Sequence, residues 1–260
     1  DGVNFQASGT FTAFAAGAYT VTVRDLNNCI APVAVNITQP AVLVLNLSSK
    51  TDVLCNGEST GSLTVAGAGG TAPYEYAIDG ATFQATGDFT GLPFGTQTLT
   101  VRDANLCIAT LNVIINQPNP IIGSVTSQTN VDCFGNSTGS VTVNGSGGTG
   151  SYLFALDGGA FGGSGTFTGL AAGNYVVTIQ DQNNCTTDVP VTITQPTALG
   201  GTVVSSMNVL CAGGNSGAVE VLGSGGTGPY QYSINGGGLF TSNATFTGLT
   251  AGPYTVIVRD

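Results

Sequence analysis

The sequence predicts an all-β fold, a tandem array of immunoglobulin-like β-sandwich domains with a 78-residue repeat. Forty glycines, ten prolines and many threonines and valines favour turns and strands over helices. Apolar residues alternate with polar ones, as in Tyr74, Tyr76 and Ile78, which is typical of a half-buried strand. Six cysteines fall in two series whose steps are all 78 residues: Cys29, Cys107, Cys185 and Cys55, Cys133, Cys211.

A Gln-Pro pair marks each predicted repeat boundary, at Gln39-Pro40, Gln117-Pro118 and Gln195-Pro196. The boundaries divide the chain into 1–38, the C-terminal half of a repeat, two complete repeats at 39–116 and 117–194, and 195–260, a repeat that lacks its last strand. One extra residue within Gly236–Gly238 shifts the last copy. Because the sequence begins and ends inside repeats, we expect it to be an excerpt of a longer array.

The complete repeat 39–116 illustrates the elements in order. Strands are expected at 42–47, 62–66, 74–78, 95–103 and 108–115, with the stretch ending in Phe89-Thr90-Gly91-Leu92 between the third and fourth. Turn signals separate them: Gly57 and Gly61 after the first strand, and Gly69-Gly70 with Pro73 after the second. Short strands at this spacing, about seven in number, are typical of a β-sandwich.

A tyrosine precedes the 95–103 strand or its equivalent in three of the four copies, as Tyr19, Tyr175 and Tyr254. Many immunoglobulin-like sandwiches place a tyrosine at this corner, where its hydroxyl bonds nearby backbone. We therefore predict a structural role for these three tyrosines. Gln97 occupies the position in the second copy, 39–116, so the corner tyrosine is not indispensable.

Composition excludes several partners and activities. Four basic residues in 260 cannot form a surface that follows phosphates, which excludes nucleic acid and anionic membranes. No apolar run reaches the roughly 18 residues of a membrane helix, so no membrane insertion is expected. The chain has no histidine and no tryptophan, and carboxylates such as Asp52 and Glu58 do not recur between repeats. We predict that the segment is not an enzyme.

One recurrent pattern could supply hard oxygen ligands to calcium: Asp25 with Asn27, Asp103 with Asn105, and Asp181 with Asn183. Calcium takes six to eight oxygens, usually from several carboxylates, whereas an aspartate in a tight hairpin commonly accepts bonds from its own turn. Turn chemistry is therefore the favoured interpretation, with calcium as the alternative and no other cofactor expected.

The paired cysteines favour disulfides made in an oxidising compartment. Two connectivities stay open. In-unit bonds would join Cys55 to Cys107 and Cys133 to Cys185, whereas a next-unit bond would join Cys55 to Cys185. A Cys29–Cys55 bond is least favoured. An immunoglobulin-like sandwich places the loop after the first strand and the last hairpin at opposite ends, which is an obstacle to in-unit bonds.

The ordered set of motifs resembles the SprB repeat of Bacteroidetes cell-surface adhesins, whose type member drives gliding motility. The set comprises Cys55-x-Gly57, Gly69-Gly70-Thr71 with Pro73-Tyr74, Phe89-Thr90-Gly91-Leu92, and Asp103-x-Asn105-x-Cys107 before Gln117-Pro118. The resemblance implies export by type IX secretion, display on extracellular filaments attached at the outer membrane, and secretion or motility machinery as partners. Departures are Gly150-Ser151 before Tyr152, Gln97 for tyrosine and Gln180 for arginine.

Two functions remain open. The repeats could form an adhesin stalk whose main partners are neighbouring repeats of the same chain, or they could bind polysaccharide or surface ligands multivalently. The loop at 69–73 and the variable stretch at 80–88 should distinguish the two, since repeated binding sites keep one chemistry. Ala81-Thr82-Phe83-Gln84 is replaced by Ala160-Phe161-Gly162-Gly163 in the next repeat, which favours the stalk.

Overall fold

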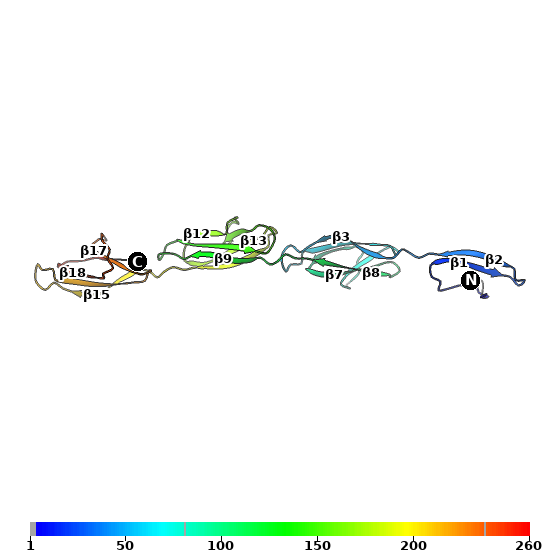
Figure 1. Ribbon diagram of the computed structural model, residues 1–260, viewed down its shortest axis with the longest axis horizontal. Coiled ribbons are helices and arrows are strands. Elements are labelled where there is room, and N and C mark those ends of the chain that lie inside the picture. The colour runs from blue at the N-terminus through cyan, green and yellow to red at the C-terminus, as the bar shows by residue number, and fades with distance from the viewer. Residues whose placement is uncertain (1–3, 81, 237) are drawn as a thin grey trace. The chain divides into compact units, whose positions relative to one another are not determined.

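The computed structural model describes residues 4–80, 82–236 and 238–260, and every regular element within those ranges is a β-strand (Figure 1). The prediction of an all-β fold is confirmed. Residue 81 of the variable stretch, the middle glycine of Gly236–Gly238 and the first three residues of the 1–38 segment lie outside the described ranges. Within the described ranges, no helix is long and apolar enough to cross a membrane.

The complete repeat 39–116 folds as two three-stranded antiparallel sheets. One sheet has the order β3-β4-β6, formed by β3 (Val44–Thr51), β4 (Gly61–Ala68) and β6 (Asp88–Leu92). The other has the order β5-β7-β8, formed by β5 (Glu75–Ile78), β7 (Gly95–Arg102) and β8 (Ile108–Ile115). In immunoglobulin nomenclature these are the A-B-E and C-F-G sheets.

The described residues of this repeat form six strands rather than about seven, and those of the variable stretch contribute an isolated bridge between Gln84 and Tyr76. The first strand also begins at Val44, two residues after the predicted start.

The other segments repeat this arrangement. Residues 117–194 form β9 (Ile122–Thr129), β10 (Gly139–Ser146) and β12 (Thr166–Leu170) in one sheet, and β11 (Leu153–Leu156), β13 (Gly173–Gln180) and β14 (Thr186–Ile193) in the other. Residues 195–260 form β15 (Gly200–Met207), β16 (Gly217–Ser224) and β18 (Thr245–Leu249), with β17 (Gln231–Ile234) pairing β19 (Val256–Arg259). The described part of 1–38 forms the hairpin β1 (Gly17–Arg24) and β2 (Ile30–Ile37).

Strand alternation builds the core of each complete repeat. In 39–116, Leu63 of β4 and Leu99 and Val101 of β7 are almost fully buried, whereas their immediate neighbours in the strands are more exposed. The corresponding core of 117–194 is centred on Val141, Val177 and Ile179. Burying one face of each sheet against the other is the main favourable contribution to folding of such a sandwich.

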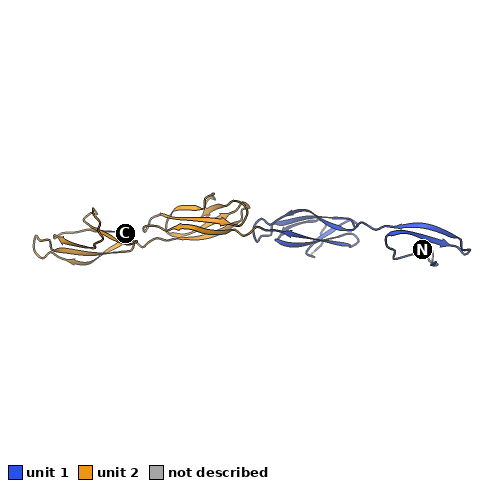
Figure 2. Cartoon of the chain, viewed as in Figure 1, with its two compact units in different colours: residues 1–117 blue, residues 118–260 orange. Residues whose placement is uncertain are grey.

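The chain divides into two compact units, and the boundary falls within the Gln117-Pro118 pair (Figure 2). The first, residues 1–117, contains β1 to β8, and the second, residues 118–260, contains β9 to β19. Every sheet lies within one of the four segments defined by the Gln-Pro pairs.

Candidate functional sites at the ends of the repeat

Residues 103–107 form the hairpin between β7 and β8. We call it the entry hairpin, because it lies at the end at which the chain enters the repeat. A buried aspartate organises it. Asp103 Oδ1 accepts the backbone N–H groups of Asn105 and Cys107, both at 2.9 Å. Its Oδ2 accepts the N–H of Thr71 at 2.9 Å, so the side chain also ties the hairpin to the loop before β5. Only 3% of Asp103 is exposed, which makes these bonds the means of satisfying a buried carboxylate.

The same arrangement recurs in the other segments. Asp181 accepts bonds from Asn183, Cys185 and Thr149, and Asp260 accepts the N–H of Thr227. Desolvation acts to raise the pKa of Asp103, but the backbone bonds from Thr71, Cys107 and Asn105 outweigh it and hold the pKa below its usual value. The ionised aspartate therefore holds the hairpin and the loop before β5 together by accepting their backbone N–H groups.

This geometry bears on the calcium alternative. Both carboxylate oxygens of Asp103 already accept N–H groups, and the side-chain amide of Asn105 donates to Thr71 Oγ1 at 3.0 Å. No cluster of three or more acidic, cysteine or histidine side chains that could hold a metal ion occurs among the described residues. The Asp-x-Asn pattern thus has the contacts that turn chemistry requires.

Glycines place the loop before β5 against the chain that enters the repeat. Gly70 N–H donates to the carbonyl of Ala41 at 2.7 Å, and the Tyr74 hydroxyl donates to the carbonyl of Gly69 at 2.6 Å. Gly69 has φ +74°, and a Cβ there would lie 2.0 Å from the carbonyl oxygen of Val42. The entry hairpin and the incoming chain therefore share one end of the repeat.

The exit loop, residues 52–60 between β3 and β4, closes on the chain that leaves the repeat. Val53 N–H donates to the carbonyl of Asn116 at 2.9 Å, and Asp52 Oδ1 accepts the N–H of Asn116 at 2.8 Å. Gly57 N–H donates to Oε1 of Gln117 at 2.8 Å.

In the next repeat, Gly135 N–H donates to Oε1 of Gln195 at 2.9 Å. The glutamine of each of these Gln-Pro pairs thus accepts a hydrogen bond from the exit loop, in addition to lying at a repeat boundary. Sequence reasoning missed this role, although the 78-residue recurrence of the glutamine beside the recurrent glycine was the available signal.

The six cysteines divide into two states. Cys55 and Cys185 are disulfide-bonded, whereas Cys29, Cys107, Cys133 and Cys211 are free and exposed. The in-unit bonds Cys55–Cys107 and Cys133–Cys185 are therefore wrong, and a Cys29–Cys55 bond is wrong as well.

The physical reason for the in-unit error lies in β8. Cys107 precedes this eight-residue strand, while Asn116, which follows it, bonds the loop that holds Cys55. Eight residues of strand span about 27 Å, far beyond the roughly 7 Å that a disulfide allows between Cα atoms.

The predicted tyrosine corner is present in all three copies. The hydroxyl groups of Tyr19, Tyr175 and Tyr254 each donate to a carbonyl four residues earlier at 3.0 Å, those of Ala15, Ala171 and Thr250. These contacts are local to the corner, and they give the tyrosines the structural role that the sequence predicted.

The variable stretch keeps one aromatic residue in register. Phe5, Phe83, Phe161 and Phe240 occupy equivalent positions once the extra glycine is counted. The arginines that end the neighbouring strands lie over three of these rings at 3.9–4.0 Å, as the pairs Arg24–Phe5, Arg102–Phe83 and Arg259–Phe240. The 78-residue period makes Ala81 equivalent to Gly159 rather than Ala160, and aligning the two alanines hides the recurrent phenylalanine.

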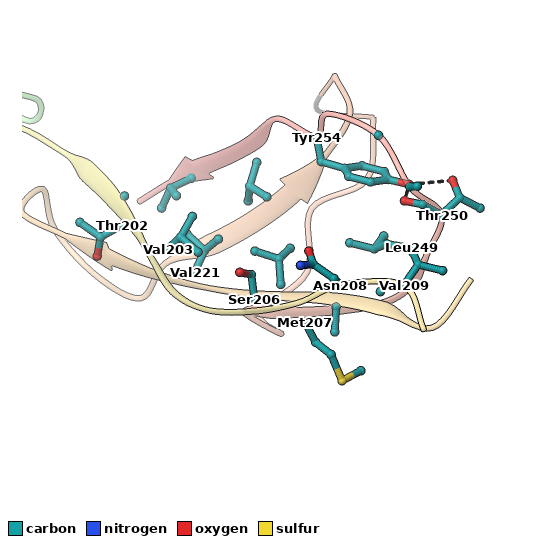
Figure 3. A pocket seen from close by; sticks show the side chains of 18 of the residues that line it. Thr202, Val203, Ser206, Met207, Asn208, Val209, Val221, Leu249, Thr250 and Tyr254 are labelled. Atoms are coloured by element: carbon teal, nitrogen blue, oxygen red, sulfur yellow. Dashed lines mark hydrogen bonds between the residues drawn. The ribbon is translucent and has the colours of Figure 1, made fainter. Parts of the chain in front are cut away.

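A pocket of about 680 Å³ lies in the last segment, lined by Val203, Val221, Leu249 and Tyr254 among others (Figure 3). Its lining residue Val221 is equivalent to Val143, which is 3% exposed in the core of the 117–194 repeat. In that repeat β14 completes the second sheet, whereas β17 and β19 form the second sheet of 195–260. The pocket is therefore the interior of the sandwich beside a two-stranded sheet, and apolar side chains line it together with polar ones such as Ser206, Asn208 and Thr250.

Comparison with protein families matches the SprB repeat at residues 47–83, 125–161 and 203–239. Comparison with curated proteins finds no match. Similar solved structures include three N-terminal domains of the bacteriophage RB49 highly immunogenic outer capsid protein, with 14% identity, a TM-score of 0.37, and coverage of 76% of this chain and 77% of that one.

The extracellular domain of protocadherin GammaB4 has 13% identity and a TM-score of 0.32, with 95% of this chain and 57% of that chain covered. Dpr2 Ig1-Ig2 in complex with DIP-Theta Ig1-Ig3 has 10% identity and a TM-score of 0.28, with 84% and 95% covered. The three family matches start 78 residues apart, which is the spacing of the cysteines and of the Gln-Pro pairs. The chain therefore contains three segments similar to the SprB repeat, one in each of the last three segments that the Gln-Pro pairs define.

Proposed function

We propose that the chain is a stalk segment of a long secreted surface filament, of the kind found in gliding-motility adhesins. The observation that carries this proposal is the use of the recurrent side chains. The aspartate of the entry hairpin and the corner tyrosine bond backbone within their own repeat, and the glutamine of the Gln-Pro pair accepts a bond from the backbone of the repeat before it. Their recurrence serves the folding of each repeat and the anchoring of its two ends, which is what a stalk built from many repeats requires.

The proposal includes type IX secretion, attachment at the outer membrane, and contacts with secretion or motility machinery, all supported by the family match. It includes no catalysis, since the sequence has no histidine and the carboxylates with lowered pKa bond backbone or neighbouring side chains. It includes no resident cofactor, because the Asp103 oxygens are already occupied by N–H groups.

An in-frame deletion of residues 117–194 in the native protein tests the stalk. A spacer that loses one complete repeat should still be exported and displayed, and surface labelling should find it at wild-type abundance. Deletion of any other complete repeat should give the same phenotype. A loss of adhesion specific to residues 117–194, with display unchanged, would contradict a purely structural role.

Multivalent ligand binding remains a second candidate because of the recurrent phenylalanine. Phe5 and Phe161 are 40% and 41% exposed, and exposed aromatic rings can stack on sugars. A glycan array probed with the intact chain distinguishes the two functions. Binding that is lost in a combined F83A, F161A and F240A variant would favour the second candidate; no binding at high protein concentration favours the stalk.

A further inference from the structure

We propose that the hydrogen bonds between the first and last strands of each complete repeat are the contact that resists stretching of the chain. The inference rests on the proposed stalk function and deepens it, by naming the residues that keep a repeat folded under tension. In the first complete repeat these strands are β3 and β8, which belong to different sheets and lie side by side; in the second they are β9 and β14. We call the bonds between them the terminal-strand contact.

Side chains at the end of β3 make this contact in the first complete repeat. Lys50 Nζ donates to the carbonyl of Ile114 at 3.1 Å, and Asp52 Oδ1 accepts the N–H of Asn116 at 2.8 Å. The backbone N–H of Val53 donates to the carbonyl of Asn116 at 2.9 Å. Both side-chain bonds join residues 64 positions apart, so the two strands run in the same direction beside each other.

The next repeat makes the same contact with different residues. Gln128 Nε2 donates to the carbonyl of Thr192 at 2.8 Å, and Asn130 Oδ1 accepts the N–H of Thr194 at 3.1 Å. The backbone N–H of Val131 donates to the carbonyl of Thr194 at 2.9 Å. Neutral amide side chains thus replace an ammonium and a carboxylate, while the backbone groups that they bond are equivalent. What the two repeats share is therefore the position of the bonds and not their charge.

The direction of the two strands determines how tension acts on this contact. The chain enters the first complete repeat before β3 and leaves it after β8, and both strands run from the entry end to the exit loop. Tension therefore draws the first strand back towards the entry end and the last strand onward towards the exit. Because the hydrogen bonds lie between the strands and not along them, this sliding strains all bonds of the contact together.

The terminal-strand contact is also common to both routes by which tension opens a repeat from its ends. Antiparallel backbone ladders hold β3 to β4 and β8 to β7. Detaching β3 breaks its ladder with β4 and the terminal-strand contact, and detaching β8 breaks its ladder with β7 and the same contact. Weakening the contact should therefore shorten the lifetime of the folded repeat under tension, whichever strand detaches first.

Stretching single molecules of the intact 260-residue chain at constant force tests the inference. Handles on the two ends apply the force, and reductant ensures that no disulfide affects the length released. The 64 residues between the bonded positions release about 220 Å at about 3.5 Å per extended residue. Each molecule should show two long-lived unfolding steps of this length, one for each repeat that has the contact.

Replacing the donor side chain by methionine, which is of similar length, removes one bond of the contact. Lys50→Met should shorten the lifetime of one step about fivefold, as expected for the loss of one hydrogen bond of ordinary strength, and leave the other step unchanged. Gln128→Met should affect the other step in the same way, so the unaltered repeat of each molecule is the internal reference. Unchanged lifetimes in both variants would overturn the inference.

Matched controls remove a side-chain bond between strands that take no part in the contact. Thr64 Oγ1 donates to Asp88 Oδ1 at 2.9 Å between β4 and β6, and the hydroxyl oxygens of Thr142 and Thr166 lie 3.1 Å apart between β10 and β12. Thr64→Val and Thr142→Val should leave both lifetimes within about twofold of wild type. A shortening as large as that of the methionine variants would also overturn the inference, because it would reflect general destabilisation of the repeat.

Lys50→Gln separates loss of the bond from loss of the side chain. A glutamine at this position supplies the donor that Gln128 uses in the next repeat, so the lifetime of the step should return close to that of wild type. A lifetime as short as that of Lys50→Met would contradict the role assigned to the bond with Ile114.

Failure of this inference is distinguishable from failure of the proposed function. The stalk function is tested on cells, by display and adhesion after deletion of a repeat, whereas the lifetimes are measured on the purified chain. Lifetimes that respond as expected, together with a loss of adhesion specific to one repeat, would leave the terminal-strand contact standing and count against the stalk. Lifetimes that do not respond, together with normal display and adhesion, would refute the contact and leave the stalk standing.

Discussion

The side-chain amide of Gln97 donates to the carbonyl of Pro93, four residues earlier, at 3.1 Å. This is the bond that the hydroxyl of Tyr175 makes to Ala171 in the next repeat. Gln97 is 5% exposed, so its amide has little access to water. The corner thus requires one side-chain donor within reach of that carbonyl, and either a tyrosine or a glutamine can supply it.

Replacing Gln97 by leucine should destabilise the 39–116 repeat by about 1–3 kcal/mol, because the Pro93 carbonyl loses its partner. Gln97→Tyr should keep most of the stability, since it restores the arrangement of the other repeats. Calorimetric unfolding of the full chain measures both. Equal stability of Q97L and wild type would show that the bond contributes nothing.

A pH-dependent contribution is expected from Asp52. The backbone N–H of Asn116, then Lys50, lower the pKa of Asp52 from 3.8 to about 2. A carboxyl whose pKa is lowered by folding contributes stability above its ordinary pKa and loses it as the pH falls through the folded pKa. The contribution should therefore be complete above about pH 4 and disappear towards pH 2. Asp52 is partly exposed, so water screening limits it to about 1 kcal/mol or less.

The control for this prediction is already present in the chain. Asn130 is the equivalent of Asp52, and its Oδ1 accepts the N–H of Thr194 at 3.1 Å without a charge. Asp52→Asn should lower stability near neutral pH and converge with wild type near pH 2 in urea titrations. A difference that stays constant with pH would assign the effect to geometry rather than charge.

Much of this architecture could be predicted from the sequence, because it depends on the types of residues at regularly spaced positions. Alternation of apolar residues predicted the sandwich, and the position of Tyr175 predicted its corner bond. The equivalent bond of Gln97 was not predicted, since a pattern of residue types does not show that an amide can replace a hydroxyl. The Gln117 contact to Gly57 was also missed, because it joins residues 60 positions apart.

The cysteine pairing shows the same limit. Sequence spacing left the in-unit and next-unit bonds open, because the 78-residue period is compatible with both. The contacts of Asn116 with Asp52, which place the exit loop at the far end of β8 from Cys107, decided against the in-unit bonds. Long-range contacts of this kind are fixed by sheet register, which composition does not report.

Calcium removal should leave the melting temperature unchanged. The oxygens of Asp103 accept three N–H groups, and a bound cation would have to displace at least some of them. Differential scanning calorimetry in chelator, in excess calcium and in excess magnesium measures this directly. A melting temperature that falls in chelator and is restored by calcium, but not by magnesium, would establish a site that these contacts argue against.

The glycines of the turns should differ sharply in their tolerance of alanine. Gly57 and Gly69 both have positive φ, at +82° and +74°, so an alanine at either position carries the left-handed backbone cost of about 1–2 kcal/mol. A Cβ on Gly57 meets nothing within 4 Å, whereas one on Gly69 lies 2.0 Å from the carbonyl oxygen of Val42. Gly69→Ala must therefore also move the incoming chain away from the loop before β5.

We expect Gly69→Ala to destabilise the chain by at least about 1 kcal/mol more than Gly57→Ala, since small-to-large changes in packed sites commonly cost 1–3 kcal/mol. The excess should also loosen the entry hairpin, because Gly70 and Thr71 hold the incoming chain and Asp103 together. Hydrogen exchange at the N–H of Thr71 should then be faster in the Gly69 variant and unchanged in the Gly57 variant. Similar exchange and similar stability in the two variants would mean that the close approach of Gly69 to Val42 is not what fixes the entry end of the repeat.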